Sequence, residues 1–401
     1  MVIDFELSPH LREARAFYRR YAAEKMRPLS RMLDENEHLR PWEFLRDAWE
    51  TSRSGAAPAP PPDERNLFTL LVIEEMSWGD AGLYLLRPGA GLGTAAIMAT
   101  GTKEQKARFL ARFREGDPKW AAMAITEPGC GSDTSALQTT ARRDGDEWVL
   151  NGAKIFCTNG SLALAESDGL AVVWATVDRS RGRAGIKAFV VEARTPGVSV
   201  AKLEQKLGIR VSDTAELVFE ECRIPADNLL GTAEVKAAAT KESFRGAMAT
   251  FDATRPIVAA QSVGVASAAL ELLKEHIVEA GQPLRYGRSA QRLTAIERDV
   301  MELEGDIEAT RLLAWRAAWM MDQGQRNSLE ASIAKAKAGQ VVTRVTQKVV
   351  EHLGPIGYSR SSLAEKWMRD AKINDIFEGT QQINLLIVAR RILGYGSDEL
   401  N

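Results

Sequence analysis

The sequence predicts an α+β fold in which helices come first, a compact antiparallel β domain follows, and helices return at the end. Three observations predict this order. Helix-type patterns fill the first 115 or so residues, short β-type runs punctuated by Gly and Pro begin near residue 121, and helix-type patterns resume near residue 243. Typical domain sizes divide 401 residues into two or three domains. We therefore expect an N-terminal helical domain over 1–120, a middle β domain over 121–240 and a C-terminal helical domain over 241–401.

The N-terminal part has helix-type patterns that are interrupted once by a different composition. In the last pattern, charged residues mark a solvated face, whereas Phe109 and Leu110 mark the buried face. Ser52–Pro62 is rich in Ala and Pro and cannot continue a helix, because proline lacks the backbone N–H, so we expect a linker or surface loop there. The expected helices span 8–34, 41–51, 66–80, 92–99 and 103–115.

The middle part carries short β-type runs. Asn151-Gly152 predicts a hairpin turn between Trp148–Leu150 and Lys154–Thr158, because Asn-Gly supplies the positive φ angles that a tight turn needs. Gly and Pro separate the later runs, which favours a compact antiparallel domain. These later runs are Leu170–Val177, Lys187–Glu192, Val198–Ala201 and Glu216–Phe219.

The C-terminal part reads as helices again. Ile257–Ala280 follows Pro256, which suits a first helical turn, and precedes Gly281, which suits the position just after a helix. Spacings of three and four between apolar residues then predict one helix face with Val300, Leu303 and Ile307 and another with Leu312, Trp315 and Trp319. Further helices are expected over 328–352, 362–370 and 380–393.

Composition and charge argue against several classes of protein. The net charge of −2 gives no basic surplus, so we expect no nucleic-acid partner. The N-terminus lacks the apolar core of a signal peptide, and the chain shows no uninterrupted apolar run that would span a bilayer. The three cysteines form no C-x-x-C pair, and the four histidines lack metal-ligand spacing. We therefore expect a soluble, cytoplasmic protein without a metal site.

The most informative segment is Ala124–Ala136, AITEPGCGSDTSA. Pro128-Gly129 would break a strand, and Gly131 would let the backbone approach a ligand closely. Thr126, Ser132 and the backbone N–H groups could then bind carbonyls or phosphates. Residue types alone favour the simpler interpretation, a polar hairpin loop, because Gly and Ser are common in any loop.

These thirteen residues resemble, position by position, a motif in the middle domain of the acyl-CoA dehydrogenase family. Its core is Thr-Glu-Pro-x-x-Gly-Ser-Asp, which is far more specific than a lone Gly-rich loop. Lys154–Gly160, KIFCTNG, resembles a second family segment, and Phe251–Val265 resembles a third, closest to the medium-chain branch. The matching features run from about Leu67 to Gly394. The resemblance implies an FAD-dependent enzyme whose C-terminal domain is a four-helix bundle.

The resemblance also implies roles for individual residues. Phe156 would contact the flavin, although a core aromatic residue on a strand is the alternative. Asp252 would contact CoA or simply cap a helix, and Arg255 would hold a phosphate or carbonyl of CoA. The implied cofactor-binding residues are Met123, Ile125, Thr126, Gly131, Ser132, Phe156, Thr158, Arg285, Thr380 and Gln382, and the implied substrate-binding residues are Ser132, Asp252 and Arg255.

Glu378 is the candidate catalytic residue. It precedes Gly379-Thr380 in a helix-breaking turn, from which a carboxylate can project into a cleft. Glu is usually exposed, so a surface residue that caps the next helix is the simpler interpretation of its type. The resemblance implies instead that Glu378 is the base that removes the α-proton of an acyl-CoA, while a hydride leaves the β-carbon for the flavin. Burial should raise the pKa of Glu378. The implied electron acceptor is an electron-transfer flavoprotein.

The sequence departs from the family where residues reach across a subunit interface to a neighbour's FAD. Pro283, Glu351 and Pro355 occupy expected contact positions, and Thr294 replaces a glutamine. A Glu near pyrophosphate would repel it, and proline has no N–H to donate. The family implies a homotetramer, whereas these departures suggest an α2β2 heterotetramer in which a paralogous subunit completes the FAD site. An acyl-CoA oxidase-like flavoprotein and a non-catalytic binding subunit are the other readings, and the acyl chain length stays open.

Overall fold

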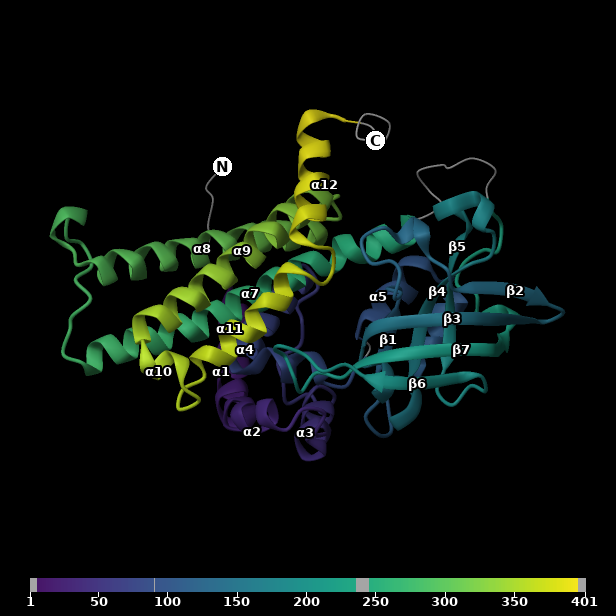
Figure 1. Ribbon diagram of the computed structural model, residues 1–401, viewed down its shortest axis with the longest axis horizontal. Coiled ribbons are helices and arrows are strands. Elements are labelled where there is room, and N and C mark those ends of the chain that lie inside the picture. Colours follow the sequence, from purple (N-terminus) through teal and green to yellow (C-terminus); the bar gives the residue numbers. More distant parts are fainter. Residues whose placement is uncertain (1–5, 90, 236–244, 396–401) are drawn as a thin grey trace.

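The structure of the chain is a computed structural model that describes residues 6–89, 91–235 and 245–395. It has a helical N-terminal part, a curled mixed sheet in the middle and a bundle of long helices at the C-terminal end. In Figure 1 the sheet lies at one end of the molecule and the bundle at the other, with α7 running from one to the other. The predicted order of helices, sheet and helices is confirmed.

The N-terminal helices differ from the prediction at two points. The single helix expected over 8–34 is broken, because Pro28 cannot donate to the preceding turn; a π turn over Ala22–Met26 and a 3₁₀ turn over Arg27–Leu29 separate α1 from α2. The long helix α4 continues past residue 80 through a kink at Asp80, whose Oδ1 accepts a hydrogen bond of 2.8 Å from Leu83 N. The helices are α1 Pro9–Tyr21, α2 Ser30–Glu35, α3 Trp42–Thr51, α4 Arg65–Leu86, α5 Gly91–Thr100 and α6 Lys103–Ala111.

The middle sheet is mixed, so the prediction of an antiparallel domain is wrong in part. β1 runs parallel to β4, and β2 meets β4 in parallel at Thr140 and Thr176. The long segment between β1 and β4 allows this, since a parallel pair needs a crossover connection rather than a tight turn. The strands are β1 Ala121–Ala124, β2 Thr140–Asp144, β3 Glu147–Thr158, β4 Leu170–Thr176, β5 Ile186–Glu192, β6 Val198–Leu203 and β7 Thr214–Pro225. Their order is β1-β4-β2-β3-β7-β6, and β5 pairs with β4.

The hairpin predicted at Asn151-Gly152 is wrong, because both residues lie inside the continuous strand β3. The turn comes earlier, at Gly145, where φ is 59° and Asp144 pairs with Glu147. Asn151-Gly152 instead forms an irregularity in the pairing of β3 with β7, and Asn151 exchanges two hydrogen bonds of 2.8 Å with Glu221. Gly152 does take a positive φ of 145°, so the pair serves a β-bulge rather than a turn.

The C-terminal helices pack around α7. The start predicted for this helix is wrong: α7 begins at Arg245, and Pro256 lies within it. One lost backbone hydrogen bond at a proline is outweighed by tertiary packing along a long buried helix. This extension places Asp252 and Arg255 in the helix interior. The helices are α7 Arg245–Glu279, α8 Ala295–Asp322, α9 Ser328–Leu353, α10 Pro355–Tyr358, α11 Ala364–Ala371 and α12 Gln381–Leu393.

Within the described residues, Thr250–Glu279 of α7 passes the length and hydropathy criteria for a membrane span, yet 78% of the qualifying window is buried inside the protein. Its apolar character therefore serves the core. The packing against α4 is tight: a Cβ added at Gly264 would lie 2.2 Å from the carbonyl oxygen of Glu74, so only glycine fits there. Burial on all sides explains why α7 lacks the amphipathic pattern of a surface helix.

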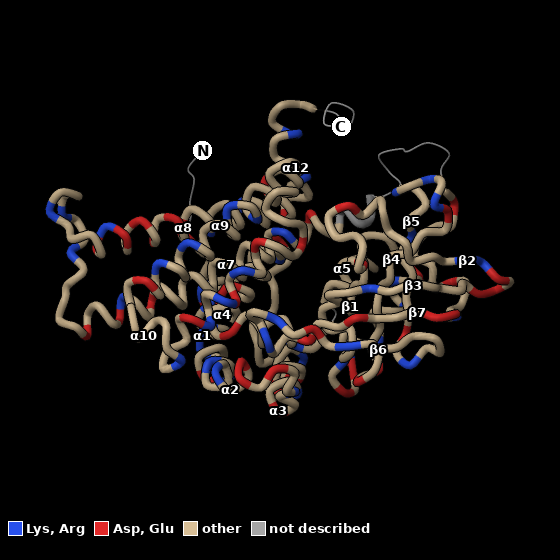
Figure 2. The backbone as a smooth tube through the Cα atoms, viewed as in Figure 1, with Lys and Arg blue, Asp and Glu red and all other residues tan. Residues whose placement is uncertain are grey.

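Charged residues are distributed differently on the surface and in the interior. On α8 and α9, acidic and basic residues occur side by side (Figure 2), as in the pairing of Arg344 with Asp306 at 2.6 Å. Such exposed pairs contribute little to stability. In the interior, Lys366 of α11 donates to Asp80 of α4 at 2.8 Å and also to Asp370, whose carboxylate accepts from the Ile209 amide of the middle part. This buried cluster joins all three parts of the chain.

Candidate active site

Glu378 lies on the turn between the 3₁₀ segment Lys372–Asp375 and helix α12. Its φ is 54° and that of Gly379 is 87°, so two successive residues adopt the left-handed region. For a glutamate this conformation is costly and indicates a residue held in place by its surroundings. The cap of α12 is Thr380, whose side chain accepts from Ile383 N at 3.3 Å. The alternative that Glu378 caps this helix is therefore wrong.

The Glu378 carboxylate is held by the C-terminal bundle. Its Oε2 atom accepts a hydrogen bond of 2.7 Å from Thr254 Oγ1 on α7. Burial of the carboxyl group raises the pKa of Glu378 above its ordinary value, against the opposing influence of the Thr254 hydrogen bond and of the nearby charges of Arg255 and Lys335. The expected direction of the pKa shift is confirmed. A raised pKa is typical of a carboxylate that serves as a base.

Two buried side chains hold the turn behind Glu378, and neither was anticipated from the sequence. Lys335 of α9 donates from Nζ to the Gly379 carbonyl oxygen at 2.5 Å, and Asn384 of α12 donates to the same oxygen at 2.9 Å. Both residues are fully buried. The available signal was the position of Lys335 between Ala331 and Gly339 on the buried, small-residue face of α9, where helical periodicity predicts an apolar side chain.

Arg255 and Asp252 lie one helical turn apart on α7. Arg255 is only 2% exposed and donates from Nη1 to Asp252 Oδ1 at 2.7 Å, and Ser328 Oγ donates to the same carboxylate oxygen at 3.1 Å. The alternative that Asp252 caps a helix is wrong, because the residue lies in the interior of α7. Among the described residues, Arg255 Nε is buried without a hydrogen-bond partner.

The predicted flavin-contacting residues of the middle part lie on two adjacent segments. Met123 lies in β1, whose end is followed by Ile125 and Thr126, and the carbonyl oxygen of Thr126 accepts from Ile155 N of β3 at 2.9 Å. Phe156 on β3 is 59% exposed and has a φ of 55°. The alternative that it is a core aromatic residue is therefore wrong. These segments form a wall, defined here as Met123–Thr126 and Phe156–Thr158.

A buried ion pair fixes the loop that follows this wall. Lys154 Nζ lies 2.7 Å from Glu127 Oε1 and also donates to the Ile125 carbonyl oxygen at 3.1 Å. The other Glu127 contacts include Thr139, whose N–H and hydroxyl donate to Oε1. Burial lowers the pKa of Lys154 to about 8, although the Glu127 charge opposes this shift. Beyond this anchor, Gly131 and Ser132 are exposed.

The wall and the glutamate are neighbours through α7. Phe251 and Ile125 pack against the same hydrophobic cluster of the middle part, and Thr254, one turn after Phe251, binds Glu378. Thr380 and the exposed Gln382 stand in the first turn of α12, just after Glu378. These positions bring the predicted cofactor and substrate residues of the middle and C-terminal parts into one region, with one exception.

Arg285 is the exception. It follows the far end of α7, a helix of 35 residues that is about 50 Å long at 1.5 Å per residue. There its guanidinium pairs with Glu297 at 2.7 Å, and Glu297 also forms the capping box of α8 with Thr294. Figure 1 shows this loop at the end of the bundle away from the sheet. Arg285 is not brought to the site of its own chain.

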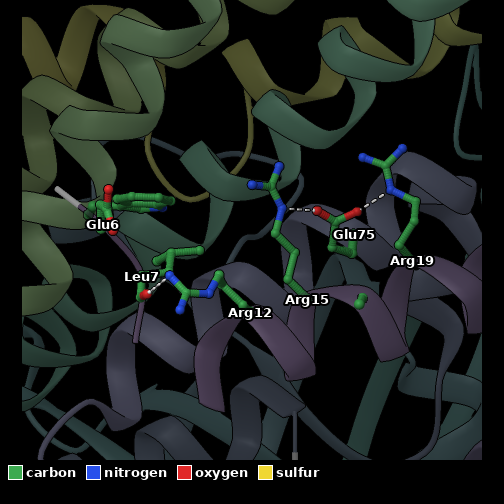
Figure 3. Close-up of a pocket in the computed structure, with 8 residues that line it drawn as sticks. Glu6, Leu7, Arg12, Arg15, Arg19 and Glu75 are labelled. Atoms are coloured by element: carbon green, nitrogen blue, oxygen red, sulfur yellow. Dashed lines mark hydrogen bonds and ion pairs between the residues drawn. The ribbon is translucent and has the colours of Figure 1, made fainter. Parts of the chain in front are cut away.

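A surface hollow of about 610 Å³ between α1 and α4 is a different feature. Its lining includes Arg15 and Arg19, which both point to Glu75 (Figure 3), and these charges satisfy one another. The hollow does not include Glu378 or any residue of the wall. We therefore assign it no part in the site.

A carboxylate with a raised pKa, together with the exposed ring of Phe156 and the half-buried hydroxyls of Thr126 and Thr158, is the arrangement expected of an enzyme that removes a proton from a substrate held against a flat cofactor. The particular family follows from comparison with known proteins. Models described as the N-terminal, middle and C-terminal domains of acyl-CoA dehydrogenase match residues 8–117, 122–222 and 244–393. The chain belongs to the acyl-CoA dehydrogenase family and is an oxidoreductase of the general acyl-CoA dehydrogenation class.

Individual relatives support this assignment. The short-chain specific acyl-CoA dehydrogenase of Rattus norvegicus mitochondria is 36% identical over 94% of this chain and 88% of its own length. Butyryl-CoA dehydrogenase from Megasphaera elsdenii has a TM-score of 0.84 at 33% identity, covering 98% and 100% of the two chains. A chain from the structure described as the electron transferring flavoprotein of Acidaminococcus fermentans has a TM-score of 0.85 at 34% identity, with the same coverage. Two of these relatives carry short-chain or butyryl names, whereas the sequence motif pointed to the medium-chain branch.

FAD is the cofactor of this family, and the residues present fit half of a flavin site. The exposed, left-handed Phe156 provides an apolar surface for a flat ring, and the exposed loop at Gly131 and Ser132 leaves room for backbone contact with a phosphate. The residues expected to reach a neighbouring subunit's FAD have other partners or lack a donor. Arg285 is bound to Glu297, Glu351 is acidic and accepts from Lys348, and Pro355 offers no N–H.

Proposed function

We propose that this chain removes the α-proton of an acyl-CoA thioester with Glu378 while the β-hydrogen leaves as hydride, forming the 2-enoyl-CoA. The observation that carries the proposal is the position of Glu378. Its carboxylate is bound to Thr254 and has a raised pKa, and its backbone is held in a left-handed turn next to the predicted flavin wall. When bound, FAD supplies the acceptor for the hydride. General dehydrogenation of acyl-CoA is the activity of the family.

The surroundings of Glu378 serve proton transfer in two ways. Burial raises its pKa, so the ionised carboxylate is a stronger base than an exposed one. Thr254 stabilises the ionised form by donating a hydrogen bond, which opposes the effect of burial on the Glu378 pKa. The Glu378 N–H has no hydrogen-bond acceptor among the described residues, so it is available to the thioester oxygen as negative charge develops there.

We propose that Met123, Ile125, Thr126, Phe156 and Thr158 form the flavin wall and that Gly131 and Ser132 face the phosphates. Thr380 and Gln382 contribute from α12. Arg255 is buried and Asp252 is half-buried near Thr254 on α7, so their contribution to CoA binding would come from the unpartnered Arg255 Nε and from holding α7 in place.

The electron acceptor that we propose is an electron-transfer flavoprotein. Support comes from the similarity to a chain of the Acidaminococcus fermentans electron transferring flavoprotein structure. An acyl-CoA oxidase-like reaction would instead reduce oxygen to peroxide. The two are separated by following reoxidation of the reduced protein with either acceptor. We expect rapid reoxidation by electron-transfer flavoprotein and slow reaction with oxygen; fast stoichiometric peroxide formation would favour the oxidase. We also propose that the protein acts in the cytoplasm.

The assembly that we propose is an α2β2 heterotetramer with a paralogous subunit, with a homotetramer as the alternative. Support comes from the fixed position of Arg285 against Glu297, and from Glu351 and Pro355 at positions where the family supplies donors to a neighbour's FAD. Expression of this chain alone tests the idea. We expect less than one FAD per chain; a homotetramer with full FAD content would refute the heterotetramer.

The activity itself is tested by anaerobic titration of the FAD-loaded, assembled protein with acyl-CoA thioesters of increasing length. We expect the yellow absorbance of oxidised flavin to bleach, beginning with butyryl-CoA because the relatives carry short-chain names. The thioester that bleaches at the lowest concentration identifies the preferred chain length. If no acyl-CoA bleaches the flavin, dehydrogenation is not the activity of this protein.

A further inference from the structure

We propose that Lys335 is a positioning residue for the proposed dehydrogenation: it holds the turn that carries Glu378 and provides a buried positive charge that stabilises the Glu378 carboxylate. The proposal rests on the proposed function of Glu378. It goes beyond that function, because it assigns a role to a side chain on a different helix that need not touch substrate.

Lys335 contacts the turn that carries Glu378. Lys335 is fully buried, and its Nζ atom lies 2.5 Å from the carbonyl oxygen of Gly379, the residue directly after Glu378. The two residues of that turn both have positive φ, which is a strained arrangement for Glu378. Strained backbone persists only where its surroundings fix it, and Lys335 supplies one of the fixing contacts.

The hydrogen bond to the Gly379 carbonyl oxygen does not require a charged donor. Asn384 is also fully buried and already donates to the Gly379 carbonyl oxygen at 2.9 Å and to the Thr380 carbonyl oxygen at 3.0 Å. A neutral donor therefore satisfies the same oxygen. Burying an ammonium group costs several kcal/mol of desolvation, so the charge needs a reason beyond the hydrogen bond.

Several charged groups act on Lys335 and Glu378. The charges that act on Lys335 of α9 are those of Asp375 and Glu378, in the segment before α12, and that of Arg255 on α7. Glu378 experiences the Thr254 hydroxyl, Arg255 and Lys335. Burial is the largest influence on Lys335 and lowers its pKa to about 8, so below that pH the side chain is a cation. A cation close to Glu378 favours the ionised form that accepts a proton.

The direction in which the Lys335 charge changes the pKa of Glu378 can be tested. Activity requires ionised Glu378, so the rate of flavin reduction rises with pH through the Glu378 pKa. Loss of the Lys335 charge should move this acidic limb to higher pH by at least about one unit, because an opposite charge favours the ionised carboxylate and acts strongly in a buried site of low dielectric.

The experiment compares Lys335→Met, which removes charge and donor, with Lys335→Gln, which keeps a donor, in the FAD-loaded, assembled protein. Lys337→Met is the matched control on the same helix, since Lys337 pairs with Asp306 on the surface of the bundle. The reduction rate is measured with butyryl-CoA from pH 5 to pH 8. We expect both Lys335 variants to shift the limb by at least about one unit and Lys337→Met to leave it unchanged. An unshifted limb in Lys335→Gln overturns the proposal.

A second readout does not depend on turnover. Urea unfolding of the wild type, Lys335→Gln, Glu378→Gln and the double variant at pH 7 forms a double-mutant cycle. We expect a favourable coupling between the two side chains equivalent to the pH shift; additive effects would overturn the electrostatic role. If no acyl-CoA reduces the wild-type flavin, the proposed function fails, while the cycle still reports whether Lys335 stabilises the Glu378 carboxylate.

Discussion

At the scale of single residues, the proposed reaction depends on how the Glu378 carboxylate is held. Glu378 combines a left-handed backbone, a hydrogen bond from Thr254 and two flanking cations, Arg255 and Lys335. Burial and these favourable partners act in opposite directions on its pKa, and burial prevails. A raised pKa makes the ionised carboxylate a stronger base, and the Thr254 hydrogen bond and the two cations favour that ionised form.

Replacement of Thr254 tests the balance of these influences. The hydroxyl donates to the ionised carboxylate, so Thr254→Val should raise the pKa of Glu378 further. A hydrogen bond to a charged group contributes about 1.5 kcal/mol, which corresponds to about one pH unit. We expect the acidic limb of the kcat profile to move up by that amount, while Thr254→Ser keeps the wild-type profile. A limb that stays in place in Thr254→Val would show that this hydrogen bond does not influence the base.

The sequence predicted some of these residues and missed others for a physical reason. Glu378 and the wall residues lie in short, characteristic motifs, so the sequence alone could indicate them as candidate site residues. Thr254 and Lys335 belong to the site only because α7 and α9 pack beside the turn, and no local pattern specifies that packing. For Lys335 a signal existed, a lysine on the buried face of α9, and it predicts burial but not its partner.

At the scale of elements, strand β3 shows how local signals are put to different uses. Most helices and strands were predictable from period and from turn residues, to within a few positions. The Asn151-Gly152 pair was not, because positive φ serves a β-bulge as well as a turn, and only pairing with β7 decides between them. In the same way, a proline usually marks the first turn of a helix, but α7 is buried on all sides and continues on both sides of Pro256.

The irregular end of β3 stores strain at the flavin wall. Phe156 has a φ of 55° and is mostly exposed, so its ring contributes little burial in the absence of cofactor. We expect Phe156→Gly to have a free energy of unfolding about 1 kcal/mol above that of Phe156→Ala, since glycine adopts this φ without strain. Urea unfolding without added FAD measures the difference, and both variants should bind FAD more weakly. Equal stabilities would show that the backbone is not strained.

At the scale of the whole molecule, the buried cluster of Asp80, Lys366 and Asp370 joins the three parts of the chain. Burial opposes the charge of Lys366, but Asp370 and Asp80 outweigh it and raise the pKa of its ammonium group. The contact of Asp370 with the Ile209 amide brings the middle part into the same network. The bundle and the sheet therefore keep a fixed relation, which the site between them requires.

Disruption of this cluster should destabilise the whole chain. Lys366→Met leaves two carboxylates buried without their cation, and breaking a buried pair in this way costs about 3–5 kcal/mol. We expect that loss in urea unfolding at pH 7, together with a lower midpoint temperature. The control is Lys202→Met, because Lys202 is an exposed lysine that also lies near two carboxylates, and we expect no measurable change. A Lys366 variant as stable as this control would refute the role of the cluster.

The central claim, that Glu378 is the base, is tested most directly by stopped-flow absorbance of the bound flavin. FAD-loaded, assembled wild type and Glu378→Gln are mixed anaerobically with saturating butyryl-CoA, and FAD content and thioester binding are measured in parallel. We expect bleaching in Glu378→Gln to be slower by up to about 10⁴-fold, because a positioned general base contributes an effect of that size, with FAD and thioester still bound. Bleaching at the wild-type rate in that variant would contradict the account.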